Sequence, residues 1–374
     1  LKLKPNFFHA LLNKGIALKN IHQYENAIKF LNLAKDIDPK KPEIYNTLGN
    51  VFKEQAYYDK AIKSYDMAIK ISSDYADAYN NKGIVLNLME KYEESFQNYK
   101  MALSINPDND YILGGVIHSK MHLCDWQNLE NSIFNLKNKI IDKNLVAGPF
   151  ILLSIFDDLK IQKLNAENHI KKNFHEYKLS NIKPSSLKNN KNIRIGYYSG
   201  EFHKHPCLLL MKDIYKYHDK SRFEIYAFSY GPNPRSNPLR DEVKPYFKTF
   251  FDISQKSDEE IINLSKDLNI DIAVNLTGLA NYERTSMFAK RVAPIQLNYL
   301  GFPGTMGAKF MDYIIADNLI IPDKMKKYYT EKVIYLPNCY QPNTNKLLDT
   351  SIKKKINRKN LGLPENGMVF CCFN

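Results

Sequence analysis

Residues 42–75 read PEIYNTLGNVFKEQAYYDKAIKSYDMAIKISSDY, and the pattern of this stretch occurs once before it and once after it at the same spacing. Three columns of identical residues mark the repeat: Gly15, Gly49 and Gly83; Tyr24, Tyr58 and Tyr92; Ala34, Ala68 and Ala102. Because several columns agree at one spacing, the first third of the chain is predicted to be an array of structural repeats.

The residue types in these columns predict pairs of helices. Tyr45 and Phe52 lie four residues before and three residues after Gly49, which places all three on one helical face. Glycine and alanine suit positions where two helices pack closely, and Pro39, which cannot continue a helix, closes the first repeat. This register resembles the tetratricopeptide repeat, in which about 34 residues form two antiparallel helices.

A fourth, decayed copy follows the three clear ones. Trp126 falls one repeat length after Tyr92, but Ile117 stands where the glycine is expected. The tetratricopeptide region is therefore predicted to span residues 1–125. Residues 126–190 are predicted to form a helical bridge that ends in a polar linker.

Stacked repeats of this kind present a concave surface that binds extended peptides. Asn13, Thr47 and Asn81 share one column of that surface. A row of asparagine amides, each able to donate and accept, would suit a peptide backbone, so proteins or peptides are the predicted partners of this groove. The alternative, that these polar residues simply face water, stays open because Thr47 interrupts the row.

Beyond the linker the sequence changes to short apolar runs separated by helical patterns. The predicted strands are 193–198, 223–229, 247–253, 271–276, 293–300, 313–316 and 332–336, and the predicted helices include 207–217, 258–268 and 282–290. Strands that alternate with helices indicate a parallel, doubly wound sheet. Residues 191–342 are thus predicted to be a Rossmann-like α/β domain. Residues 343–374 are predicted to be a linker followed by the first strand of another such domain, at 368–373.

Three loops at the carboxyl ends of the predicted strands are polar or rich in glycine. They are 199–206 (SGEFHKHP), 275–278 (NLTG) and 301–307 (GFPGTMG). Open α/β sheets bind ligands beyond the carboxyl ends of their strands, so these loops form the predicted site. His205 is the candidate acid–base or orienting group because imidazole titrates near neutral pH. The alternative is a helix-capping or packing role.

The sequence lacks the usual motifs of metal-binding and phosphate-binding sites. His118 and His122 stand four residues apart, but in a decayed repeat they are interpreted as helix-face residues. His203 and His205 have no third ligand nearby in the sequence, so no metal site is predicted. Neither GxGxxG nor GxxxxGKS/T occurs.

The composition is that of a globular protein, with 44% hydrophobic and 25% charged residues. No apolar run reaches the roughly 18 residues that a membrane-spanning helix needs, so no membrane partner is expected. The net charge of +13 comes without a nucleic-acid-binding motif, so nucleic acid is not an expected partner either. Five cysteines without paired spacing favour a reducing, cytoplasmic location.

Three segments carry a resemblance to a known family: 193–206 (IRIGYYSGEFHKHP), 294–317 (PIQLNYLGFPGTMGAKFMDYIIAD) and 361–374 (LGLPENGMVFCCFN). They resemble the tetratricopeptide-containing O-linked N-acetylglucosamine transferases and their SPINDLY-like relatives. The tripeptide at 124–126 (CDW) fits that family's passage from repeats to catalytic region. The resemblance covers essentially the whole chain.

The resemblance implies an inverting, metal-independent transferase with two Rossmann-like halves, the GT-B arrangement, of which 191–342 is the N-terminal half. A serine or threonine hydroxyl of a target protein would attack the anomeric carbon of a nucleotide sugar. The first candidate donor is UDP-N-acetylglucosamine, a substrate, and no cofactor is implied. By carry-over His205 lies at the active site, Leu300, Gly301 and Pro303 line the sugar pocket, and Thr277 lies in the loop opposite.

Two departures from the family pattern bear on this interpretation. Leu209 stands where the animal enzymes have a second histidine, and the SPINDLY-like branch includes fucosyl transferases that use GDP-fucose, so the donor sugar stays open. The family's diphosphate-binding lysine is expected just past Asn374, so the chain as given is expected to be a truncated, inactive portion. The alternatives are an O-fucosyl or N-linked hexosyl transferase and a non-catalytic repeat scaffold. A homodimer formed through the repeats also stays open.

Overall fold

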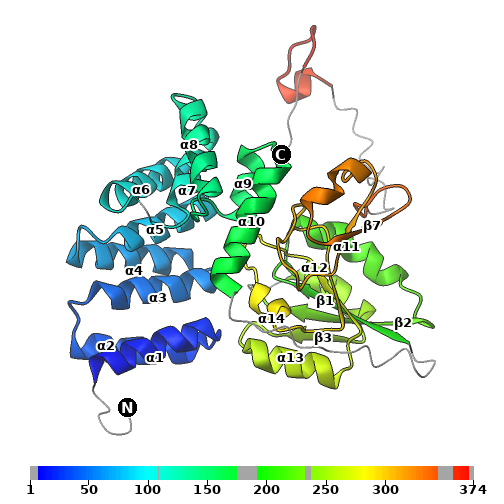
Figure 1. Ribbon diagram of the computed structural model, residues 1–374, viewed down its shortest axis with the longest axis horizontal. Coiled ribbons are helices and arrows are strands. Elements are labelled where there is room, and N and C mark those ends of the chain that lie inside the picture. The colour runs from blue at the N-terminus through cyan, green and yellow to red at the C-terminus, as the bar shows by residue number, and fades with distance from the viewer. Residues whose placement is uncertain (1–6, 108, 175–191, 232–236, 344–356, 370–374) are drawn as a thin grey trace.

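The computed structural model describes residues 7–107, 109–174, 192–231, 237–343 and 357–369 (Figure 1). A helical array occupies one side of the molecule and a parallel sheet with its helices the other, and α10 stands between them. The predicted linker before residue 191 and most of the strand predicted at 368–373 lie outside the described residues. None of the described helices is both long enough and apolar enough to cross a bilayer.

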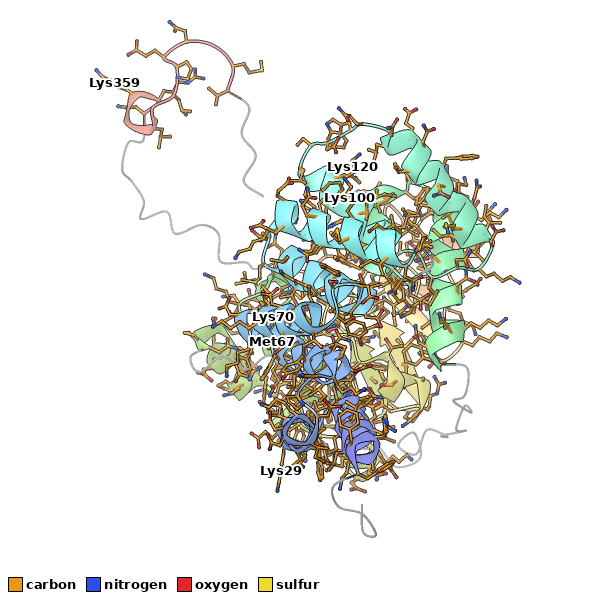
Figure 2. The ribbon with its side chains drawn as sticks, turned by 90° about the vertical axis from the view of Figure 1, so that its left-hand side faces the viewer. Lys29, Met67, Lys70, Lys100, Lys120 and Lys359 are labelled. Atoms are coloured by element: carbon orange, nitrogen blue, oxygen red, sulfur yellow. The ribbon has the colours of Figure 1, made fainter. Side chains whose placement is uncertain are left out.

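The three predicted repeats are three helix pairs: α1 (Phe8–Asn20) with α2 (Tyr24–Ile37), α3 (Pro42–Glu54) with α4 (Tyr58–Ile71), and α5 (Ala76–Leu88) with α6 (Tyr92–Ile105). The repeated glycine is the point of closest packing within each pair. A Cβ on Gly49 would overlap the ring of Tyr65, and one on Gly83 would lie 2.9 Å from Tyr99. The second helix of each pair faces outward, as Met67 and Lys100 on this surface show (Figure 2). The tetratricopeptide solenoid is confirmed.

Four helices lead from the repeats to the sheet: α7 (Ile112–His122), α8 (Leu129–Ile141), α9 (Pro149–Ile155) and α10 (Leu159–Phe174). The repeat glycine is not lost in α7 but displaced by two residues from Ile117. A Cβ on Gly115 would lie 2.7 Å from the ring of Tyr99, on which Gly83 also packs. Trp126 precedes α8 and is 58% exposed, so it does not reproduce a packed repeat position.

The α/β domain is built on one parallel sheet, which in the described residues has seven strands. They are β1 (Ile193–Ser199), β2 (Phe223–Ser229), β3 (Thr249–Asp252), β4 (Ile272–Asn275), β5 (Ile295–Asn298), β6 (Tyr313–Ala316) and β7 (Lys332–Tyr335). Their order is β3-β2-β1-β4-β5-β6-β7, so the direction of winding reverses between β1 and β4. The doubly wound sheet is confirmed, and each strand lies within two residues of its predicted bounds.

Helices cover both faces of the sheet. The helices around the sheet are α11 (Pro206–Tyr217), α12 (Pro238–Val243), α13 (Asp258–Asp267) and α14 (Thr285–Ala289), with short 3₁₀ turns η2 (Lys244–Tyr246) and η3 (Asp323–Tyr328). A further turn, η4 (Lys359–Leu361), lies away from the sheet (Figure 1). Met211 of α11 packs on one face, against Tyr197. Ala166 of α10 belongs to the core of the other face, with Tyr198 and Ile261. The bridge helix α10 is therefore anchored to the sheet.

The helix predicted at 282–290 begins only at Thr285. Tyr282 has a left-handed backbone, with φ of 58°. A helix cannot pass through that conformation, and the residue instead belongs to the loop that follows β4.

Gly49→Ala is expected to lower the stability of the repeat array by about 2 kcal/mol, because the added methyl group overlaps the buried Tyr65 ring. Thermal unfolding of the variant measures this loss. Gly148→Ala is the matched control, because a Cβ there would have nothing within 4 Å. Equal melting temperatures for the two variants would contradict the packing argument.

Candidate active site at the interface of repeats and sheet

The winding reversal places the loops after β1 and β4 beside each other at the carboxyl edge of the sheet. At such a switch point the two loops leave a crevice in which ligands bind. The loop after β1 carries Glu201, His203 and His205, and the loop after β4 carries Thr277. Two of the three predicted loops therefore meet at this edge.

Hydrogen bonds tie these two loops together. The backbone N–H of Gly200 donates to Thr277 Oγ1 at 2.9 Å, and Asn275 Oδ1 accepts from the N–H groups of Thr277 and Gly278 at 3.1 and 3.0 Å. Thr277 is only 1% exposed. Its hydroxyl joins the loops, and its predicted position opposite the sugar pocket stays a prediction.

The loop after β5 packs against both of the others. A Cβ on Gly301 would overlap the carbonyl oxygen of Leu276 and would lie 3.4 Å from Cys207 Sγ. Cys207 is the second residue of α11, directly after Pro206 and two residues from His205. The structure thus brings Gly301 next to Cys207, two residues from His205, so two of the loops that the sequence assigned to one site do meet.

Leu300 and Pro303 lie on the other side of this loop. They line a shallow recess with Ile314 of β6 and with Tyr340. Leu300 has a left-handed backbone, with φ of 69°, a conformation that costs a non-glycine residue of the order of 1 kcal/mol. The turn after β5 is therefore held by its surroundings, and the role of both residues in a sugar pocket stays a prediction.

His205 is the N-cap residue of α11. Its Nδ1 accepts the backbone N–H of Cys207 at 3.3 Å, so the helix-capping role is real, yet its side chain remains 37% exposed. Glu201 Oε2 lies 3.7 Å from the same Nδ1 and 3.4 Å from His203 Nε2. One carboxylate oxygen therefore faces two imidazoles. Sequence reasoning gave Glu201 no role, although a carboxylate between a strand end and two histidines was a visible signal.

Burial sets the protonation of this cluster. Glu201 is 6% exposed, and its burial raises the pKa of the carboxyl group to about 7. Burial, together with the neighbouring His205 and Arg240, lowers the pKa of His203 to about 4. Burial also lowers the pKa of His205. At neutral pH both imidazoles are neutral, and Glu201 is the group that changes charge.

A cleft of about 520 Å³ lies between this cluster and the repeats. On the sheet side it is lined by His203, Tyr230 and Tyr282, and on the repeat side by Tyr57 and Tyr58, in the turn that joins α3 and α4. The hydroxyls of Tyr58 and Tyr282 are 2.5 Å apart and connect the two sides. The sequence did not predict that the repeats would form one wall of the site.

The lining of this cleft offers a polar group without a partner. Gln55 Oε1 is buried and accepts no hydrogen bond from the described residues. A buried acceptor that lacks a donor costs free energy, and a ligand with an N–H or O–H group would satisfy it. Aromatic walls with a few such polar groups are typical of ligand sites.

The predicted peptide-binding column is not a continuous row of free amides. Asn13 is exposed, whereas Thr47 is buried and its hydroxyl donates to the carbonyl of Glu43 at 2.7 Å. Asn81 Nδ2 donates to Asn46 Oδ1 at 2.9 Å, which links the second and third repeats. Peptide binding by this column stays a prediction.

No group of three or more ligating side chains suited to a metal occurs among the described residues. His118 and His122 do meet, with their Nε2 atoms 3.3 Å apart. Asn87 bonds His118 Nδ1 at 3.1 Å and Tyr92 stacks on His122, so this pair is integrated into the packing of α5 to α7.

Comparison with known proteins defines the class first. Models of the tetratricopeptide repeat match residues 8–41, 57–89 and 76–109, and the model of glycosyl transferase family 41 matches residues 159–356. The chain combines a tetratricopeptide array with a region of glycosyl transferase family 41. Because the second match covers more than half of the sequence, the chain belongs to glycosyl transferase family 41.

Named relatives agree with this assignment. The chain is 35% identical over 189 residues to the probable UDP-N-acetylglucosamine–peptide N-acetylglucosaminyltransferase SEC of Arabidopsis thaliana, a match that covers 49% of this chain and 19% of the relative. It is 38% identical over 160 residues to the UDP-N-acetylglucosamine–peptide N-acetylglucosaminyltransferase of Caenorhabditis elegans, covering 41% and 14%. The Arabidopsis SPINDLY protein is 29% identical over 150 residues, covering 40% and 16%. The matches thus span less than a fifth of each relative.

A solved structure shows the same fold. A mutant O-GlcNAc transferase from Thermobaculum terrenum aligns with a TM-score of 0.58 at 23% identity, over 90% of this chain and 58% of that one. The likeness supports a GT-B type of arrangement, with the repeats joined to a Rossmann-like unit.

Glu201→Gln is expected to make the protein more stable than the wild type at pH 8.5 but not at pH 4.5. The carboxyl group has its pKa raised from 4.5 to about 7 on folding, so the folded state binds the proton more tightly and stability falls as pH rises through this window. At 1.36 kcal/mol per unit, the loss above pH 7 amounts to about 3 kcal/mol, and a neutral glutamine avoids it. Melting temperatures of both proteins across pH 4.5–8.5 test this. A difference that is constant with pH would contradict it.

Proposed function

We propose that this protein transfers a sugar, with N-acetylglucosamine from UDP-N-acetylglucosamine as first candidate, to serine or threonine hydroxyls of other proteins. One observation carries the proposal: the loop that holds His203 and His205 borders, through His203, a cleft whose opposite wall is made by the repeats. Repeats of this kind bind peptides, so a polypeptide held there would pass next to an imidazole at a ligand-binding sheet edge. The names of the Arabidopsis and Caenorhabditis relatives support the donor and the peptide acceptor.

In this reaction the acceptor hydroxyl oxygen bonds to the anomeric carbon from the side opposite the nucleotide. The bond from that carbon to the diphosphate oxygen breaks, its electron pair leaves with UDP, and the configuration is inverted. The hydroxyl proton passes to a base. Rate enhancement requires the hydroxyl to be held in line and the departing diphosphate to be stabilised electrostatically. We assign the first task to His205, as base or as orienting group.

The donor is a substrate in this scheme, so the proposal invokes no resident cofactor. Acceptor proteins would be recruited through the repeat groove, in which Asn13 and Asn81 remain candidate contacts. A cytoplasmic location and self-association through the repeats, both raised by the sequence, belong to the same proposal.

Transfer by the full-length protein should appear as a mass gain on one or more acceptors. The experiment co-expresses it with a panel of candidate acceptor proteins, supplies UDP-N-acetylglucosamine, GDP-fucose or UDP-glucose to the purified mixture, and reads intact mass. One donor is expected to be used, and His205→Ala is expected to reduce transfer at least 100-fold, as for the loss of an acid–base group.

His9→Ala is the matched control, because His9 is exposed on α1 and does not line the cleft. It should transfer at the wild-type rate. Normal turnover by a folded His205→Ala variant would remove His205 from the mechanism. No mass gain with any donor, together with peptide binding by the protein, would favour the non-catalytic scaffold.

A further inference from the structure

Two groups compete for one nitrogen of His205. The backbone N–H of Cys207 points at Nδ1 from 3.3 Å, and Glu201 Oε2 approaches the same atom to 3.7 Å. A neutral imidazole has one N–H and one lone pair. Nδ1 accepts from Cys207 in the observed geometry, with the proton on Nε2. It could instead donate to Glu201, with the lone pair on Nε2, once the two side chains move a few tenths of an ångström closer than 3.7 Å, but it cannot do both.

The two states present opposite chemistry on the other ring nitrogen. With the proton on Nε2, His205 is a hydrogen-bond donor. With the lone pair on Nε2, it can accept a proton from a hydroxyl group. The partner of Nδ1 therefore decides what the ring offers, as is general for histidines whose tautomer is set by a second group.

We propose that Glu201 is a positioning residue that selects the tautomer of His205, and so switches it between donor and proton acceptor. The carboxylate takes the proton of Nδ1 and leaves Nε2 unprotonated. The inference rests on the proposed function: when the acceptor oxygen bonds to the anomeric carbon and the diphosphate leaves with its electron pair, the hydroxyl proton moves to Nε2. The imidazolium that forms faces the negative charge of Glu201.

Glu201 is suited to this role by its burial and by its neighbours. It is the most deeply buried member of the cluster, and its pKa of about 7 lets it change charge near neutral pH while His205 stays neutral. His203 Nε2 faces the same oxygen from 3.4 Å. The other titratable or charged groups around the cluster are Cys207 of α11, Tyr230 after β2, Arg240 of α12 and Tyr282 after β4.

Those neighbours do not change charge in the same range. Burial raises the pKa of Cys207 to about 12 and raises the pKa values of Tyr230 and Tyr282 still further. Burial lowers the pKa of Arg240, and arginine stays protonated in proteins. A change of tautomer near pH 7 therefore reports Glu201.

The direct test is the tautomer itself. Protein labelled with ¹⁵N in its nine histidines is measured by long-range ¹H–¹⁵N correlation between pH 6 and pH 8.5, with His205 assigned from the missing signals of His205→Ala. The Nδ1–H form of His205 is expected to grow as pH rises through about 7. Glu201→Gln should abolish this dependence, and Glu201→Asp should restore it with a shifted midpoint. A wild-type tautomer that does not change with pH, or the same change in Glu201→Gln, would overturn the proposal.

The kinetic test uses the full-length protein and its active donor. The value of kcat/KM for transfer should rise through pH 7 in the wild type. Glu201→Gln should be about 10-fold or more slower at pH 8 with a flat profile, and Glu201→Asp should recover the slope. Glu242→Gln, on the exposed face of α12, is the matched control and should follow the wild type.

The NMR titration and the kinetic test distinguish the positioning role of Glu201 from the proposed transferase function. A purely structural role for Glu201 would lower activity by the same factor at every pH, and that result would refute the positioning role. If no donor supports transfer, the proposed function fails, and the NMR titration alone still decides whether Glu201 sets the tautomer of His205.

Discussion

The loops at the carboxyl edge of the sheet approach one another backbone to backbone, with no room for a side chain between them. A Cβ on Gly231 would overlap the carbonyl of Gly200, one on Gly301 would overlap that of Leu276, and one on Gly278 would overlap Phe302. The first two of these contacts are with main-chain atoms and the third is with the buried Phe302 side chain, so the loops cannot slide past each other without losing the contacts as a group. This packing of the loops fixes the position of His205 relative to the sheet.

Close packing at the edge also creates the electrostatics of the site. Glu201 lies behind the exposed histidine, shielded from water, so its ionised form loses hydration. The buried carboxylate therefore lowers the free energy of unfolding at neutral pH, and in return the protein has a carboxyl group that titrates there. Such an exchange is common where function requires a perturbed group, and in this chain it can be traced to three residues of one loop.

Much of this structure could be predicted from the sequence. The repeated columns predicted the solenoid because each glycine must face a large residue such as Tyr65. The apolar runs predicted the strands, and parallel topology alone placed His205 and Gly301 at one edge. The fixed repeat spacing did not locate the glycine of α7. Gly115 lies two residues before the expected position and still packs on Tyr99.

The rest of the site could not be predicted because it depends on long-range docking. Tyr58 and Tyr282 are separated by 224 residues, and no local pattern encodes the angle at which the repeats meet the sheet. The raised pKa of Glu201 likewise depends on how completely the loops exclude water. The direction of the Thr277 side chain depends on the same loop packing, because its hydroxyl accepts a hydrogen bond from Gly200 instead of facing outward.

The contact between Tyr58 and Tyr282 also fixes the number of helices that can lie between the α3–α4 turn and the sheet. Helices α4 to α9 separate the α3–α4 turn from α10, which is fixed to the sheet through Ala166. Gain or loss of one helix pair within that interval would shift and rotate the turn by one step of the solenoid, and the cleft would lose its second wall. Repeats can therefore be gained or lost freely only on the N-terminal side of α3. The length of the array can vary, but the spacing from Tyr58 to the sheet cannot.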